Sequence, residues 1–226
     1  MSPQIFALLV DATLETLIMV AISAALGALL GAPLGILLGV TGKGDLLQHV
    51  AFNRIAGALV NSIRSTPFII LVVAIIPFTR LVTGSSIGTS AAVVPLTMAA
   101  TPFIARIVEG AIREVDRGLI EAAEAMGATP LQIIRNVLVP EALPSITLGL
   151  TLAVVSLIGY SAMVGAVGGG GLGDLGIRYG YQRFLPEVMA AVVAVLIVLV
   201  QIVQSAGELD RAAGQQAQSP FVAAKC

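Results

Sequence analysis

The chain has 226 residues, of which 57% are hydrophobic and only 11% charged, and its mean hydropathy is +0.99. Soluble domains carry about 25% charged residues, so this chain cannot cover a soluble core with polar surface, and a soluble globular protein is excluded. The formal net charge of −1 gives no basis for nucleic-acid binding, and the single cysteine, Cys226, excludes an internal disulfide bond.

Several stretches are apolar enough to cross a bilayer core, which takes about 20 predominantly apolar residues per helix. We therefore predict an all-α membrane protein, a single polytopic domain over residues 1–226 with about five transmembrane helices. The spans are expected at 13–40, 66–81, 87–107, 146–167 and 188–203. The other segments are expected as an interfacial start at 1–11, a polar connection at 41–65, a loop at 108–145 and a polar tail at 206–226.

The first span carries a stripe of small residues, at Gly27, Gly31, Gly35 and Gly39. Such a stripe lets a second helix approach the backbone closely, which matters because lipid offers no hydrophobic drive for helix pairing. A packing face within one subunit is favoured over a seam between two subunits, and both interpretations stay open.

Prolines interrupt the second span, at Pro67 and Pro77, and the third, at Pro95 and Pro102. Such interruptions are common where helices line a transport route, because the freed carbonyl groups can face a cavity. Plain packing kinks give the same pattern, so the prolines alone do not identify a route.

The polar segment at 121–144, EAAEAMGATPLQIIRNVLVPEALP, is the most informative stretch of the chain. Gly127 suits the left-handed residue that ends a helix. Thr129 suits the cap of a second helix, with Pro130 at its first position and a glutamine completing a capping box. Pro140 is expected to end that second helix. The pattern predicts two short helices joined at a sharp angle between two spans, a rigid unit suited to a groove of a partner protein.

The basic residues predict how the chain is oriented. Nine of the twelve lysine and arginine residues fall in 41–65, 106–145 and the C-terminal tail, and three fall in the two loops on the opposite side. Basic residues concentrate on the cytoplasmic side of a membrane. The loop at 108–145 and the C-terminus are therefore predicted to be cytoplasmic and the N-terminus to be outside.

The polar segment also resembles a known motif. Glu121-Ala122-Ala123, then Gly127, Val137 and Val139-Pro140 resemble the EAA loop of the membrane subunits of ABC importers that use separate binding proteins. Valine stands at 137 where isoleucine is usual and at 139 where leucine is usual. In that family the loop docks onto the ATP-hydrolysing subunit. The resemblance implies coupling to the ATPase by Glu121, Ala122, Ala123, Gly127, Thr129, Pro130, Arg135 and Pro140.

A narrower resemblance, to the methionine-uptake permeases, lies in four further motifs. They are Arg64-Ser65-Thr66-Pro67-Phe68, Ile76-Pro77-Phe78-Thr79-Arg80, Pro102-Phe103-Ile104-Ala105-Arg106, and Gly171-Leu172-Gly173 with Tyr179-Gly180-Tyr181. The resemblance implies a type I ABC importer permease in a bacterial cytoplasmic (inner) membrane that imports D/L-methionine. It also implies an extracytoplasmic amino-acid-binding protein or lipoprotein as a partner, for which Asp174, Arg178 and Arg183 are candidate contacts unless they are merely solvated.

The chain lacks the residues of an ATPase. Gly42-Lys43-Gly44 has neither the spacing of a phosphate-binding loop nor the Ser or Thr that follows its lysine. We therefore predict a transport subunit and not an enzyme, without a cofactor of its own, with ATP and Mg on a separate ATPase. Because a five-span chain encloses little and oligomers are most often two-fold symmetric, two copies with two ATPase subunits are expected.

Three residues of the fourth span are candidates for a translocation path. Tyr160 and Met163 lie three residues apart and so share a helix face, with Ser161 adjacent. A tyrosine hydroxyl at membrane depth needs a partner, and a flexible thioether suits an apolar ligand, although simple helix packing explains the pair equally well. Two other functions stay open. One is an ABC permease for another small amino acid or organic solute. The other is an ion-coupled secondary transporter, which would need intramembrane charges that 17–40 and 146–167 lack.

Overall fold

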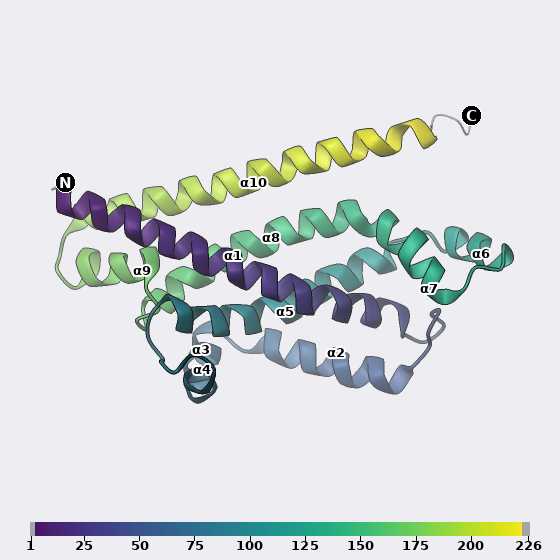
Figure 1. Ribbon diagram of the computed structural model, residues 1–226, viewed down its shortest axis with the longest axis horizontal. Helices are drawn as coiled ribbons and strands as arrows, with labels where there is room; N and C mark the ends of the chain where they lie inside the picture. Colours follow the sequence, from purple (N-terminus) through teal and green to yellow (C-terminus); the bar gives the residue numbers. More distant parts are fainter. Residues whose placement is uncertain (1–2, 223–226) are drawn as a thin grey trace.

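The protein is all-helical in a computed structural model that describes the backbone of residues 3–222 and the side-chain surroundings of residues 3–208. Its elements, in order, are α1 (Pro3–Val40), α2 (Val50–Ser65), α3 (Phe68–Ala74), α4 (Ile76–Thr83), α5 (Thr89–Arg113), α6 (Arg117–Ala125), α7 (Pro130–Ile133), the π-helical η1 (Ile134–Leu138), α8 (Val139–Gly165), α9 (Gly171–Leu175), the π-helical η2 (Gly176–Tyr181) and α10 (Pro186–Val222). The long helices α1, α5, α8 and α10 run along the long axis of the molecule (Figure 1). Helix α9 lies near the N-terminus at one end, and α6 and α7 lie at the other.

Within the described residues, four helical stretches are long and apolar enough to cross a membrane: Pro3–Val40, Thr89–Arg113, Pro130–Gly165 and Pro186–Glu208. The pair Val50–Ser65 and Phe68–Ala74 forms a fifth if its two parts, bent by 102°, count as one broken span. The predicted all-α architecture with about five candidate spans is therefore confirmed.

The second candidate span differs from the sequence prediction. We expected a connection at 41–65 and a span at 66–81, whereas 50–65 forms the helix α2 and 68–83 forms two short helices. The break between α2 and α3 falls at Thr66 and Pro67. A proline disfavours helical backbone in the residue before it, and Thr66 accordingly has an extended ψ of 126°. The hydropathy of α2 is low because polar residues are mixed with its apolar ones. It buries Gly57 and Val60, whereas Ile55 and Leu59 are 71% and 63% exposed.

The two ends of the chain also differ from the predicted boundaries. Helix α1 begins at Pro3, so residues 3–11 continue the first helix and do not form a separate interfacial segment. Helix α10 continues to Val222, well past the expected span at 188–203 and through most of the predicted polar tail. Residues 223–226 of that tail lie outside the described residues.

The glycine stripe of α1 packs against α5 of the same chain. A Cβ atom added at Gly27 would lie 2.6 Å from the Cβ of Ala100, and one at Gly39 would lie 2.8 Å from Cγ2 of Ile112. Real Cβ contacts are not this short, so the stripe brings the two backbones together. The packing face within one subunit is the interpretation that the structure supports.

The end of the bundle near the N-terminus is closed by side chains of α1. The backbone N–H of Gly171 donates to the carboxylate of Glu15 at 2.7 Å, and that of Leu172 donates to the hydroxyl of Thr16 at 2.9 Å. Gly171 has a φ of +72° and a Cβ there would lie 2.6 Å from the Thr16 hydroxyl oxygen, so glycine is required. These bonds satisfy the first N–H groups of α9 and tie it to α1 across 156 residues of sequence.

Candidate functional site

Helix α6 has a defined beginning and end. Asp116 precedes it, and its side chain accepts a hydrogen bond from the N–H of Gly118 at 2.8 Å. Gly127 follows it with a φ of +81°. The N–H groups of Gly127 and Ala128 donate to the carbonyls of Glu124 and Ala123 at 2.9 and 3.1 Å, the pairing of a Schellman C-cap. The predicted left-handed conformation of Gly127 is confirmed.

Helix α7 starts as the sequence predicts. Thr129 caps it, the side chain of Gln132 accepts from the Thr129 N–H at 2.8 Å, and Pro130 occupies the first turn. This capping box satisfies N–H groups that have no partner inside the helix. Only two residues separate the end of the α6 cap from Pro130, so the two helices meet at a tight, well-defined corner.

The prediction that the second helix ends near Pro140 is wrong. Helix α7 passes through η1 directly into α8, and Pro140 lies in the first turn of α8. The N–H of Val139 donates to the carbonyl of Ile134, five residues back, instead of four. Proline has no N–H group to donate, and its ring would clash with the preceding turn of a regular α-helix. The wider π turn accommodates both features of Pro140. Any force on α7 therefore acts directly on the long helix α8.

The α6–η1 segment, residues 117–138, buries one side and exposes the other. Ala123, Ile133 and Leu138 are at most 3% exposed and belong to the main core. Met126 and Leu131, in contrast, are 81% and 74% exposed at the end of the molecule. Large exposed apolar side chains on a polar segment are typical of a site that binds another protein.

The sequence-predicted residues of this segment therefore divide into two groups. Ala123 faces the core and is not a surface contact, which corrects its assignment. The exposed members are Glu121, Ala122, Gly127, Thr129, Pro130, Arg135 and Pro140. Sequence reasoning missed Met126 and Leu131, although large apolar residues within a polar loop were a visible signal.

A cavity of about 650 Å³ lies beside α6. Charged side chains of both signs line it: Lys43, Arg113 and Arg117 with Asp45, Glu121 and Glu124. The loop between α1 and α2 forms its other wall. Glu121 thus lies at a cavity that α6 shares with the α1–α2 loop and the end of α5.

An ion-pair cluster holds the end of α5 that leads into α6. Glu109 is 5% exposed, and its carboxylate contacts Arg106 at 2.5 Å and Arg113 at 2.9 Å. Arg106 also donates to the carbonyl of Gly57 in α2 at 2.8 Å, and Arg113 to that of Leu38 in α1 at 3.4 Å. Because removing one partner of a buried pair typically costs about 3–5 kcal/mol, the cluster fixes α1, α2 and α5 together next to α6.

A second, smaller cavity of about 150 Å³ lies where α2 and α3 meet α5 and α8, and Tyr160 lines it. The Tyr160 ring stacks on Phe68, with centroids 4.5 Å apart and planes 17° from parallel. Ser161 is 2% exposed and donates its hydroxyl to the carbonyl of Ile158 at 2.7 Å, so it does not face this cavity, which corrects its assignment. Met163 is 49% exposed and is not among the cavity residues. Of the three predicted path residues, only Tyr160 reaches the cavity.

The cavity contains residues that sequence reasoning missed. Arg64 and Thr66, at the end of α2, line it together with Phe68. They were missed because 41–65 was interpreted as a connection outside the membrane. The signal that would have found them was the Arg64-to-Phe68 motif itself, in which a cation directly precedes a proline-broken apolar run.

The candidate contacts for an external partner lie at the end of the bundle opposite α6. Arg178 forms an ion pair with Asp174, and the guanidinium of Arg183 lies 4.4 Å from the centroid of the Tyr179 ring. Both arginines therefore have partners within the chain, and both are exposed. Residues 3–208 hold no group of three or more His, Cys, Asp or Glu side chains that suits a metal ion.

Comparison with known proteins gives consistent matches over most of the chain. Residues 31–207 match the family described as "Binding-protein-dependent transport system inner membrane component". A Vibrio cholerae protein, "Probable D-methionine transport system permease protein MetI", is 58% identical over 89% of each chain. The "D-methionine transport system permease protein MetI" of Escherichia coli K12 is 50% identical over 73% of this chain and 76% of its own.

A solved structure agrees in fold as well as in sequence. The structure described as "Inward facing conformations of the MetNI methionine ABC transporter" superposes with a TM-score of 0.93 at 50% identity, covering 95% of this chain and 99% of that one. The match to the family extends from within α1 to within α10 and includes the whole α6–η1 segment. The chain therefore belongs to the family of inner membrane components of binding-protein-dependent transport systems.

Proposed function

We infer that the chain is the permease subunit of an ATP-driven importer of D/L-methionine, and that it moves its substrate into the cytoplasm. The similarity to methionine permeases carries this inference, since it extends over nearly the whole of both chains at 58% identity. The TM-score of 0.93 against a methionine ABC transporter supports it at the level of the fold.

The α6–η1 segment is proposed to dock onto a separate ATPase subunit, which binds ATP and Mg. The exposed Met126 and Leu131 offer apolar anchors, and Glu121 and Arg135 offer charges around them. The tight corner between α6 and α7 makes the segment rigid, and η1 connects it to α8 without a flexible joint. Movement of the ATPase would therefore turn α8, whose Tyr160 lines the smaller cavity.

The working unit is proposed to contain two copies of this chain, two ATPase subunits and an external amino-acid-binding protein. Helix α2 exposes Asn61, Ser62 and Ser65 in the isolated chain, although it belongs to a candidate membrane span. Polar side chains in a span face protein or water and not lipid. A second copy facing α2 would enclose this polar face and form the path by alternating access. In this proposed arrangement the N-terminus lies outside, and α6 belongs to the cytoplasmic loop.

Uptake by proteoliposomes tests the function. Vesicles that contain the chain, its ATPase and the binding protein are expected to accumulate labelled L-methionine only with internal ATP, with competition by unlabelled L- and D-methionine and not by glutamate. Uptake driven by an ion gradient without ATP would instead establish a secondary transporter. Stronger competition by a different amino acid or organic solute would establish another substrate for the same class of permease.

Arg178→Glu together with Arg183→Glu is expected to weaken association of the binding protein at least about tenfold at low salt, and less at high salt, because exposed complementary charges mainly accelerate encounter. Surface plasmon resonance on the reconstituted complex measures it. Lys43→Glu, a single charge reversal at the opposite end of the bundle, is the control and should leave association unchanged. If the double variant and the control bound the binding protein equally well, these arginines would contact only solvent and not the binding protein.

A further inference from the structure

Arg64 is an exposed charge within a candidate membrane span. It is in the last turn of α2, just before the break at which the α2–α3 pair bends by 102°. Among the residues whose side chains are described, none gives its guanidinium a hydrogen bond or an ion pair. Charged side chains within candidate spans are uncommon and face a bundle interior or a water-filled cavity, where they mark substrate or ion routes.

The 150 Å³ cavity beside Arg64 has two chemically distinct parts. Arg64 and the neighbouring Thr66 make its polar part. Its other lining residues are apolar or aromatic: Ile63, Phe68, Leu71, Ala99, Pro102, Phe103 and Tyr160.

The cavity lies halfway along the bundle. Ala99 is ten residues after the start of α5 at Thr89, and Phe103 is ten residues before its end at Arg113. Helix α5 runs along the long axis of the molecule and packs against α1, α2 and α8 (Figure 1). A broken span that ends at a cavity near mid-depth is the arrangement by which many transporters hold their substrates.

These two parts match the chemistry of an amino acid with an apolar side chain. A guanidinium offers a planar fork of N–H donors that fits a carboxylate with two hydrogen bonds. The stacked rings of Phe68 and Tyr160 offer apolar surface to a thioether, because sulfur packs favourably against aromatic rings. The carbonyl groups of Arg64 and Ser65, at the open end of α2, accept no hydrogen bond from the described residues and so remain available to an ammonium group.

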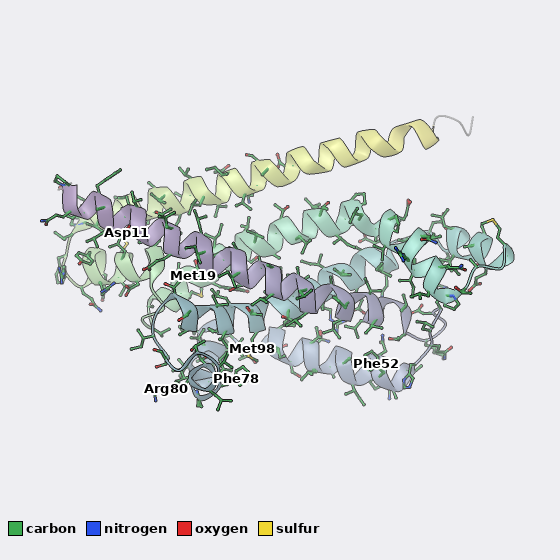
Figure 2. The ribbon with its side chains drawn as sticks, in the orientation of Figure 1. Asp11, Met19, Phe52, Phe78, Arg80 and Met98 are labelled. Carbon is green, nitrogen blue, oxygen red and sulfur yellow. The ribbon has the colours of Figure 1, made fainter. Side chains whose placement is uncertain are left out.

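We propose that Arg64 is the carboxylate-binding residue of a transient amino-acid subsite at the break between α2 and α3, with Phe68 and Tyr160 holding the side chain of the substrate. This subsite rests on the proposed function, since it assigns a place for methionine inside the permease. Phe78 and Arg80, labelled on α4 in Figure 2, are not among the residues that line the cavity.

The first experiment labels the subsite directly in the complete complex of permease and ATPase in nanodiscs, without binding protein. The probe is a diazirine analogue of L-methionine that keeps both the carboxylate and the ammonium group. Photolabelling is expected within the permease peptides that contain Phe68, Phe103 and Tyr160, as located by mass spectrometry. Excess L-methionine should suppress this labelling, whereas methioninol, which lacks the carboxylate, should not. Suppression by methioninol equal to that by methionine would overturn the role of Arg64 without any substitution.

The second experiment uses variants on the same helix. Arg64→Gln is expected to lower both labelling and ATP-driven methionine uptake at least tenfold, and Arg64→Lys to lower them less, because lysine keeps the charge but not the fork. Arg54→Gln removes an exposed arginine near the other end of α2, does not touch the cavity, and should change neither quantity more than twofold.

The outcomes separate the subsite from the proposed function. Wild-type vesicles that take up no methionine would refute the function, whatever the variants do. Wild-type uptake that persists in Arg64→Gln with unchanged labelling would refute the subsite alone. A third outcome combines two results: Arg64→Gln loses the two-copy assembly in size-exclusion chromatography, and the wild type shows no labelling of the cavity peptides. This outcome would assign Arg64 to the contact between copies and overturn the subsite.

Discussion

A permease that carries Glu121→Lys is expected to insert and fold normally but to recover its ATPase subunit at no more than about a tenth of the normal yield. Glu121 is exposed at the corner where α6 meets the cavity of mixed charge, so the substitution leaves the core untouched. Reversing a charge within a docked interface costs several kcal/mol, and about 1.4 kcal/mol already lowers affinity tenfold. A pull-down of the ATPase with the tagged permease measures the yield.

Glu141→Lys is the matched control for this experiment. Glu141 is an exposed glutamate in the first turn of α8, outside the α6–η1 segment, and the substitution changes the net charge equally. The control should recover the ATPase at normal yield. If both variants recovered it equally, α6 would not be the docking element and the proposed coupling route through α8 would fail.

Replacing Gly35 by alanine is expected to destabilise the packing of α1 on α5 strongly. The added Cβ would lie 2.7 Å from the Cβ of Val108 and closer still to the carbonyl oxygen of Ala105, both on the buried face of α5. Overpacking of this kind costs on the order of 3 kcal/mol, since the backbones of α1 and α5 must move apart. In a domain of this size that loss lowers Tm by roughly 6–12 °C, as thermal unfolding of the purified permease would measure.

Gly110→Ala provides the opposite result from the same chemical change. A Cβ at Gly110 meets no atom within 4 Å, so the substitution introduces no clash. Alanine in place of glycine within a helix stabilises it by up to about 1 kcal/mol, which should raise Tm slightly. A Gly35→Ala protein as stable as the Gly110→Ala protein would show that α1 and α5 have room to separate.

Local patterns predicted the features that short stretches of chain control. The left-handed Gly127, the capping box of Thr129 and the angled start of α7 all depend on hydrogen bonds between residues a few positions apart, so the sequence of 121–132 was sufficient. The number of candidate spans followed in the same way from composition, because each span needs only its own apolar length. The resemblance of 121–140 to an importer loop then identified the family that residues 31–207 match.

Three errors have one cause, which is that the relevant partner lies far away in the sequence. Helix α2 is only partly apolar, and it is recognisable as part of a broken span once α5 covers its buried face. Ala123 and Ser161 carry the right residue types for a contact and a path, yet the surrounding helices decide which way each side chain points. The expected end at Pro140 failed for a different and local reason, since a π turn, and not a helix end, accommodates the proline.

The amino-acid sequence by itself determined that the protein spans a membrane, where its helices are capped and which family it belongs to. These properties depend on the composition of single stretches of chain or on residues within one or two helical turns of each other. The tertiary structure alone decided that the glycine stripe packs on α5, that α7 continues into α8 and that Arg64 meets Phe68 and Tyr160 at one cavity. Each of these depends on close packing between different helices or on a backbone adjustment, and periodicity carries no information about either.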